Sequence, residues 1–148
     1  MRVITLALAR RTGQYALMPG GATEADFAAV EQTLGVQLIA KHRELLAVEN
    51  GWQRWYGECF LMMSSTNGVI ESTQLVERHP GFLGFASDGS REIIGLDMRR
   101  DPQPVVMIDI TSAGWQDAMF QADSLEDFME RLRTGEGLRW DVPYEGHA

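Results

Sequence analysis

Few side chains in this sequence are spaced for metal or nucleophilic chemistry. The three histidines, His42, His79 and His147, lie far apart, and the chain has neither the HxxxH nor the CxxC spacing that places two ligands beside one zinc ion. The one cysteine, Cys59, begins an apolar run, whereas a reactive thiolate needs electropositive surroundings. We therefore expect histidines at the edge of the core or on the surface, a buried inert thiol, and neither a bound metal nor a cofactor.

Catalytic motifs of other kinds are also missing from the sequence. No GxSxG nucleophile elbow and no P-loop occurs, and the short glycine pairs are too brief to cradle a phosphate. Carboxylates are abundant enough to supply an acid and a base of the glycosidase type, although such residues most commonly form a solvated acidic face. An enzyme of unknown chemistry is therefore the least favoured class, and we expect the protein not to be an enzyme.

Aromatic side chains are the strongest candidates for binding. Trp52, Trp55 and Tyr56 fall within five residues, in a segment that we expect to be a loop after a helix. Such a loop either folds over the core or presents anchors to a partner, because Trp and Tyr dominate the energetics of protein interfaces. Trp115 lies in a second expected loop, with the same two alternatives.

Charge is the most informative bulk property of the chain. The 148 residues include 13 Lys and Arg against 21 Asp and Glu, a net charge of −8. This balance disfavours a nucleic-acid binder, which needs a basic surface to match phosphates. The segment from Asp101 to Glu130 contains no Lys or Arg and seven acids, and it would steer a cationic partner. The seven acids are Asp101, Asp109, Asp117, Asp123, Glu126, Asp127 and Glu130.

We take Asp117, Asp123 and Glu126 from that segment as candidate partner-binding residues. Asp88 is a further candidate. It begins the dipeptide Asp88-Gly89, which is typical of a turn between strands, and the alternative is a loop at a binding cleft.

The elements that would position these residues begin with helices. Thr23 is expected to cap a first helix, Gly35 to end it, and a second helix is expected over about 39–49. A last helix is expected to start at Ser124 and to stop before two glycines. The apolar stripes of the first and last helices are Phe27, Val30 and Leu34, and Leu125, Phe128, Met129 and Leu132.

Strands and turns fill the middle of the sequence. Asn67-Gly68 favours a tight hairpin, and Ser72 is expected to start a short helix through Glu77. Turns every dozen or so residues indicate an antiparallel meander, and alternating residues near the end suggest that the tail packs as an edge segment. The expected strands are 59–63, 82–86, 92–98, 105–110 and 118–122, and the alternating tail residues are Trp140, Val142 and Tyr144.

The chain length predicts a single domain, with a core at about 23–132. Residues 1–21 then form an N-terminal extension and residues 133–148 a tail. The run Val3–Ala9 resembles the apolar part of a signal peptide, but Arg10 and Arg11 follow where small neutral residues belong, so we expect a retained strand. No run approaches the ~20 apolar residues of a membrane span. The sequence therefore predicts a soluble cytoplasmic protein.

Four short motifs in this order resemble the SMI1/KNR4 (SUKH) superfamily, over roughly Thr23 to Leu132. Two departures are Ile39, where the family usually has proline, and Ser90, where a second glycine is common. The motifs are Phe27-x-x-Val30-Glu31-x-x-Leu34-Gly35-x-x-Leu38, Leu45-Leu46-x-x-Glu49-Asn50-Gly51, Gly81-Phe82-Leu83-Gly84-Phe85-Ala86-Ser87-Asp88-Gly89 and Ser124-Leu125-Glu126-Asp127-Phe128-Met129-Glu130-Arg131-Leu132.

The resemblance implies an α+β fold with two N-terminal helices, an antiparallel-dominated meander sheet and a C-terminal helix. It also implies a bacterial immunity protein, which binds and neutralises a cognate toxin domain, often a nuclease. An acidic binder suits a basic nuclease because opposite charges speed encounter. The alternative is an intracellular regulatory scaffold without a toxin partner, as the family's fungal members exemplify. The oligomeric state stays open.

Overall fold

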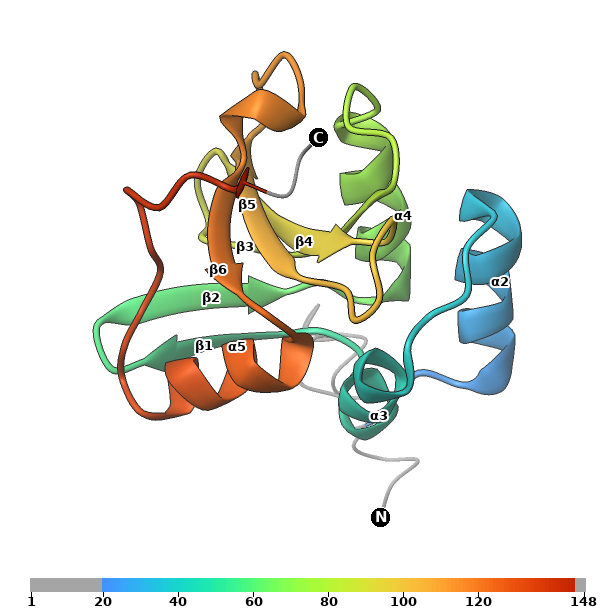
Figure 1. Ribbon diagram of the computed structural model, residues 1–148. Coiled ribbons are helices and arrows are strands. Elements are labelled where there is room, and N and C mark those ends of the chain that lie inside the picture. Colours follow the sequence, from blue (N-terminus) through green and yellow to red (C-terminus); the bar gives the residue numbers. More distant parts are fainter. Residues whose placement is uncertain (1–19, 146–148) are drawn as a thin grey trace.

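The computed structural model describes residues 20–145, which fold into helices and one six-stranded sheet (Figure 1). The strand expected over Val3–Ala9 and His147 lie outside the described residues. The helices are α2 (Glu24–Leu34), α3 (Ala40–Val48), α4 (Thr66–Leu75), α5 (Leu125–Arg133) and the short 3-10 helix η2 (Trp115–Asp117). The strands are β1 (Trp52–Tyr56), β2 (Cys59–Met63), β3 (Phe82–Ser87), β4 (Glu92–Asp97), β5 (Val105–Asp109) and β6 (Met119–Ala122).

The sheet is an antiparallel meander, as the turn spacing predicts. Its strands lie in sequence order from β1 to β6, and each pairs antiparallel with the next. Together with the two N-terminal helices and the C-terminal helix, this confirms the predicted α+β fold.

The aromatic segment after α3 is a strand, so the prediction of a loop is wrong. Residues Trp52 to Tyr56 pair with β2 along their whole length, from Trp52 opposite Met63 to Tyr56 opposite Cys59. Aromatic residues favour strands. Gly57, with φ of 65°, opens the two-residue turn, at the position where tight hairpins prefer glycine.

The helix α4 replaces both the hairpin predicted at Asn67-Gly68 and the short helix predicted from Ser72. Ser65 caps it, since its hydroxyl accepts the Gly68 amide at 3.2 Å, and the Asn50 side chain accepts the Thr66 amide at 2.9 Å. Gly68 therefore sits in the capped first turn, where its low helix propensity costs little and tertiary capping overrides its turn preference.

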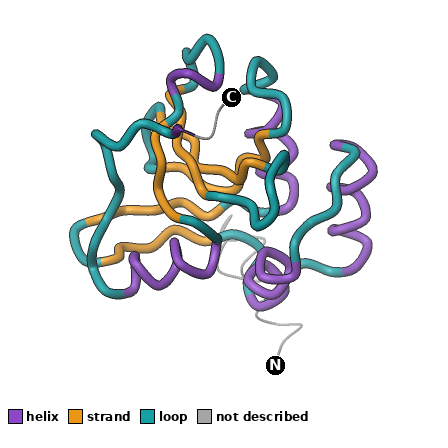
Figure 2. The backbone as a smooth tube through the Cα atoms, in the orientation of Figure 1, coloured by secondary structure: helices purple, strands orange, loops and turns teal. Residues whose placement is uncertain are grey.

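The main core lies between one face of the sheet and the helices. Figure 2 shows α3 and α5 below the strands and α2 beside them. Phe27 and Val30 of α2 and Leu125, Phe128 and Leu132 of α5 are buried in this core, and Leu34 and Met129 are half-buried against it. The two predicted apolar stripes therefore build the core.

A second cluster covers the other face of the sheet and ties down the C-terminal tail. Trp115 of η2 and Tyr144 pack there with Val76, Phe82, Ile93, Val106 and Ile108. The tail runs along β6, because the Phe120 amide donates to Val142 and the Tyr144 amide donates to Ala118. The prediction of an edge segment at the tail is confirmed.

Candidate protein-binding groove

Trp55 is the exposed member of the aromatic group on β1. Strand alternation sends Trp52 and Tyr56 to the core side, where the Trp52 indole donates to the Tyr56 hydroxyl at 2.9 Å. Trp55 points to the opposite side and is 66% exposed. Its ring lies 5.2 Å from that of its cross-strand partner Phe60. Of the three predicted anchors, Trp55 is therefore the one available to a partner.

A groove of about 560 Å³ opens beside Trp55. It runs between the tip of the β1–β2 hairpin, the turn after β3 and the loop that follows α5. The loop contributes a second exposed tryptophan, Trp140, which is 56% exposed. The lining residues are Trp55, Glu58, Cys59, Phe60, Asp88, Gly135, Glu136, Gly137, Leu138 and Trp140.

Glycines lie where the two walls of the groove meet. A Cβ atom on Gly57 at the hairpin tip would lie 3.8 Å from the Cα of Gly135, and one on Gly137 would lie 3.9 Å from the Cβ of Cys59. Gly135 and Gly137 have φ of 86° and 68°, which favours glycine. The helix-ending glycines predicted from the sequence therefore also shape this wall.

Two buried or half-buried side chains hold the loop after α5 in place. The guanidinium of Arg131 donates to the carbonyls of Gln121 and Gly137, at 2.5 and 3.1 Å. The Gln121 side chain, fully buried, donates to the Arg139 carbonyl at 2.7 Å and accepts the Arg139 amide at 2.9 Å. The groove wall is thus preorganised by hydrogen bonds to α5 and β6.

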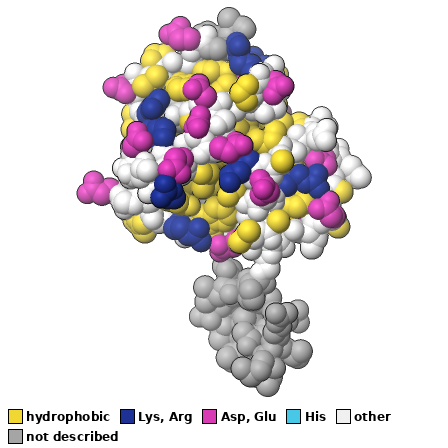
Figure 3. Space-filling view, turned by 60° about the horizontal axis from the view of Figure 1, so that its bottom comes forward, with side chains coloured by type: hydrophobic (Ala, Val, Ile, Leu, Met, Phe, Trp, Pro, Cys, Tyr) yellow, Lys and Arg dark blue, Asp and Glu magenta, His cyan; other side chains and the backbone are white. Residues whose placement is uncertain are grey.

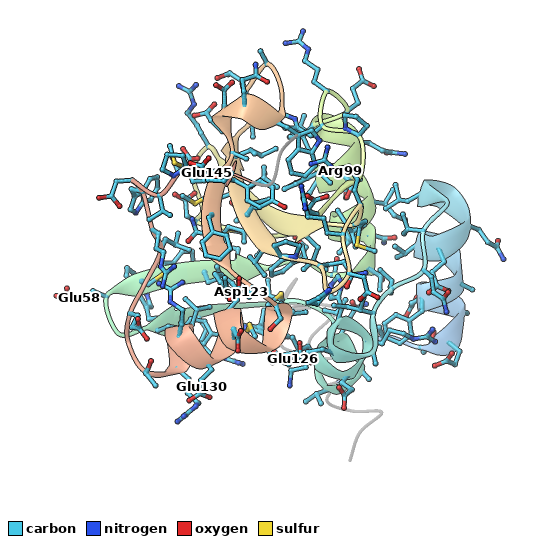
Figure 4. The ribbon with its side chains drawn as sticks, viewed as in Figure 1. Glu58, Arg99, Asp123, Glu126, Glu130 and Glu145 are labelled. Carbon is cyan, nitrogen blue, oxygen red and sulfur yellow. The ribbon has the colours of Figure 1, made fainter. Side chains whose placement is uncertain are left out.

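The groove combines exposed indole rings with negative charge. Glu58, Asp88 and Glu136 line it, and none of its lining residues is basic. Figure 4 shows Glu58 projecting from the hairpin tip. Asp88 also holds its own turn, since its carboxylate accepts the Ser90 amide at 2.9 Å. Both interpretations of Asp88, turn former and cleft residue, therefore apply to its position.

Cys59 lines the groove but is not placed as a nucleophile. The side chain is half-buried rather than fully buried, which corrects the sequence-based expectation. Burial and the neighbouring charge of Asp88 raise the pKa of the thiol, against a backbone hydrogen bond from Leu138. A protonated thiol is a poor nucleophile.

Trp115 belongs to the core, so the alternative of an exposed anchor is wrong for this residue. It is 7% exposed, and its indole donates to the Pro80 carbonyl at 2.9 Å. The Arg99 guanidinium stacks on the ring at 3.9 Å from its centroid. The sequence could not distinguish the two cases, because a tryptophan beside glycine suits either.

Comparison with known proteins places the fold in a family. The model of the SMI1/KNR4 family (SUKH-1) matches residues 21–131. The chain belongs to the SMI1/KNR4 family. The SUKH family is known for immunity proteins and has a generally non-enzymatic fold. No curated protein matches the chain.

The boundary of the SMI1/KNR4 match runs through the groove. The hairpin wall, with Trp55 and Glu58, and the turn at Asp88 lie inside the matched residues 21–131. The opposing wall, residues 135–140, lies beyond them. No sequence pattern indicated this second wall, since its glycines suggested only the end of a helix.

The other acidic candidates lie away from the groove, and Asp117 lies apart from Asp123 and Glu126. Asp117 in η2 and Asp123 lie at opposite ends of β6, and Asp123 and Glu126 lie at the start of α5 (Figure 4). The groove lies beside the C-terminal end of this nine-residue helix, and the two helix ends are about 13 Å apart along the axis. Figure 3 shows Lys and Arg among the Asp and Glu side chains on the lower face. The base-free sequence segment therefore does not form one base-free surface.

Within residues 20–145 of this SMI1/KNR4 chain, a serine, a histidine and an aspartate lie together, and their geometry is not that of a catalytic triad. Ser112 lies between the other two, with its hydroxyl 2.9 Å from His79 Nε2 and 3.2 Å from an Asp117 oxygen. In a triad the histidine lies between the serine and the carboxylate. His79 is buried at 3% exposure, so this group ties two loops together.

Metal binding has no support in the described part of the chain. No three His, Cys, Asp or Glu side chains of residues 20–145 are grouped so that they could hold an ion. His42 and His79 are both buried, which corrects the expectation of core-edge or surface histidines. Within the same residues, no helix combines the length and the apolar character needed to span a bilayer.

Proposed function

We propose that this protein is a bacterial immunity protein, acting in the cytoplasm, that binds and neutralises a cognate toxin domain through the groove beside Trp55. The observation that carries the proposal is the groove itself, where two exposed indoles and three carboxylates surround a preorganised cavity in a family known for immunity proteins. Exposed tryptophans next to a cavity are typical anchors of a protein interface.

The chemistry of the groove favours a basic protein partner. A toxin that cleaves nucleic acid must attract phosphates, so it carries positive charge near its active site. Carboxylates around the groove would speed its approach, and Trp55 and Trp140 would supply the desolvated contacts that slow its release. Binding at that basic surface would keep the toxin from its substrate.

The experiment uses a toxin encoded beside the gene for this protein. We expect co-expression to protect cells from that toxin and the purified pair to form a complex. Trp55→Ala should weaken the complex by about 2 kcal/mol or more and reduce protection, while changing the free energy of unfolding by less than about 0.5 kcal/mol. Leu75→Ala is the matched control, because Leu75 is a similarly exposed apolar residue on α4, at 61%.

Two results would contradict the proposal. If no neighbouring toxin binds and expression of the protein protects against none of them, the regulatory scaffold becomes the better description. If a toxin binds with equal affinity to the wild type and to folded Trp55→Ala and Trp140→Ala variants, the protein is an immunity protein whose binding surface lies outside the groove.

A further inference from the structure

We infer that the groove is built to receive an arginine side chain of the partner, held between Trp55, Trp140 and the carboxylates of Glu58, Asp88 and Glu136. The inference rests on the proposed function, which supplies the premise that the partner is a protein. It adds the chemical identity of the group that enters the groove.

The first argument comes from how this protein treats its other aromatic rings. Four arginines of the chain lie over aromatic rings within the same molecule. They are Arg43 over Phe27 at 4.9 Å, Arg54 over Trp52 at 5.1 Å, Arg99 over Trp115 at 3.9 Å and Arg139 over Phe120 at 5.8 Å. Within residues 20–145, the two groove indoles have no such cation, although they are the most exposed tryptophans. The ring of Trp55 packs beside Phe60, and the exposed parts of both indoles are accessible to a cation from outside.

The second argument is uncompensated charge. In the described part of the chain, Glu58 and Asp88 form no ion pair, and Glu136 has one long pair with Arg131, at 3.6 Å. Other acids nearby are neutralised, as Glu130 is by Arg133 on the same helix. The groove therefore concentrates three carboxylates, two of which form no ion pair within the described residues.

Arginine matches this combination better than lysine does. Its planar guanidinium stacks on an indole and offers several donors to carboxylates at the same time. The compact ammonium of lysine is more strongly hydrated and loses more on entering a partly closed cavity. Glu58 and Glu136 come from different walls of the groove, so carboxylates face an entering guanidinium from both the hairpin and the loop after α5.

The test uses a small probe, so that it does not depend on the toxin. N-acetyl-arginine amide is titrated into the full chain while the indole N–H resonances of Trp55 and Trp140 are followed by NMR. Saturable shifts are expected, with a dissociation constant on the order of 10 mM. N-acetyl-citrulline amide, the uncharged analogue, should give no saturation, and N-acetyl-lysine amide should bind more weakly.

Variants locate the effect. Combined Glu58→Gln, Asp88→Asn and Glu136→Gln substitutions should weaken arginine binding at least fivefold, whereas Asp123→Asn with Glu126→Gln, the matched control at the far end of α5, should leave it unchanged. Amide spectra of each variant verify that it is folded.

The inference would be overturned if the citrulline amide bound as tightly as the arginine amide. It would also be overturned if the groove variants and the control variants lost the same amount of affinity for the arginine amide. If arginine amide fails to bind while a toxin still depends on Trp55, the inference is wrong and the proposed function stands. If arginine amide binds and no toxin does, the groove recognises arginine in a partner of another class, and the proposed function is wrong.

Discussion

Two residues that contact each other, Asp97 at the end of β4 and Tyr144 in the tail, have shifted pKa values. Asp97 is fully buried, and burial alone would raise the pKa of its carboxyl, but hydrogen bonds from Arg99 and Tyr144 hold that pKa below its ordinary value. The Tyr144 hydroxyl donates to Asp97 at 2.6 Å. Burial, together with Asp97, raises the pKa of Tyr144 to about 12, so the phenol keeps its proton as the donor. This pair links the C-terminal segment to β4.

Replacing Tyr144 with Phe should destabilise the fold while keeping its shape. The change removes a hydrogen bond to a buried charge, which typically costs about 1.5–3 kcal/mol of unfolding free energy. Urea unfolding of the wild type and the variant measures the difference. Tyr144 is only 5% exposed. An unchanged urea midpoint in the variant would mean that the arginine neighbours of Asp97 satisfy its carboxylate fully.

His42 predicts a pH dependence of stability. It is fully buried on α3, its ring lies 5.8 Å from that of Phe85, and no described residue hydrogen-bonds to either ring nitrogen. Burial lowers its pKa from 6.5 to about 4. Between these pH values the unfolded chain binds a proton that the folded chain does not, so stability should fall as pH falls, by about 3 kcal/mol in total.

The variant His42→Phe isolates this contribution. Its unfolding free energy should lose the part of the pH dependence that lies between pH about 6.5 and about 4. Urea unfolding at several pH values measures both proteins. An identical slope in the two would show that His42 is protonated without cost in the folded state.

At the scale of elements, α5 connects the core to the groove. Ser124 caps the helix by accepting the Asp127 amide at 3.1 Å, acids occupy its first turn and arginines its last. This arrangement suits the helix dipole. Its buried side holds Phe128, whose ring meets Phe85 edge-on at 5.9 Å, and its last turn supplies Arg131 to the groove loop.

Truncating Phe128 to Ala should cost about 3–5 kcal/mol of unfolding free energy, because a fully buried ring leaves a cavity. Glu126→Ala, on the exposed side of the same helix, serves as the control and should change stability by less than about 0.5 kcal/mol. Thermal or urea unfolding compares the two. A small loss for the Phe128 variant would mean that the core around α5 collapses to fill the space.

Helices and strands were predictable from the sequence where the spacing of apolar residues corresponds to the side chains that are buried. The α2 and α5 stripes follow their apolar pattern because they pack on the main core, and the central strands β3 to β5 are continuous apolar runs because they are buried between the two clusters. The helix α4 was not predictable, since its start depends on caps from Ser65 and Asn50, and Asn50 lies 16 positions away from Thr66 in the sequence. The local preference of Asn67-Gly68 points to a turn instead.

The candidate site was predictable in part. Trp55 and Asp88 were identified by residue type, but the choice of Trp55 over Trp52 depends on strand register, and Trp115 is buried by elements distant in sequence. The contribution of Glu58, Glu136 and Trp140 depends on the tertiary approach of Gly57 to Gly135. No local pattern encodes that approach.

For the whole molecule, the placement of charge decides how a partner arrives. Neutralising Glu58, Asp88 and Glu136 together should slow association with a basic toxin by about tenfold at low salt and flatten its salt dependence. Stopped-flow mixing measures the rates. Neutralising Asp117, Asp123 and Glu126 should have a smaller effect, because none of these acids lines the groove. Equal effects of the two sets would show that net charge, rather than the groove, steers the encounter.

The two walls of the groove differ in how freely they can change. The backbone of the hairpin wall continues into the sheet, so an insertion or deletion there would shift the pairing of β1 with β2. The wall at residues 135–140 is held by hydrogen bonds between its backbone and the side chains of Arg131 and Gln121, and by Leu138, which packs against the main core. If the proposed function holds, new side chains at the other positions of this stretch, with Leu138 kept, should alter which toxin is recognised at little cost in stability. Loop grafting onto residues 135–140 is therefore the expected way to give this domain a new binding specificity.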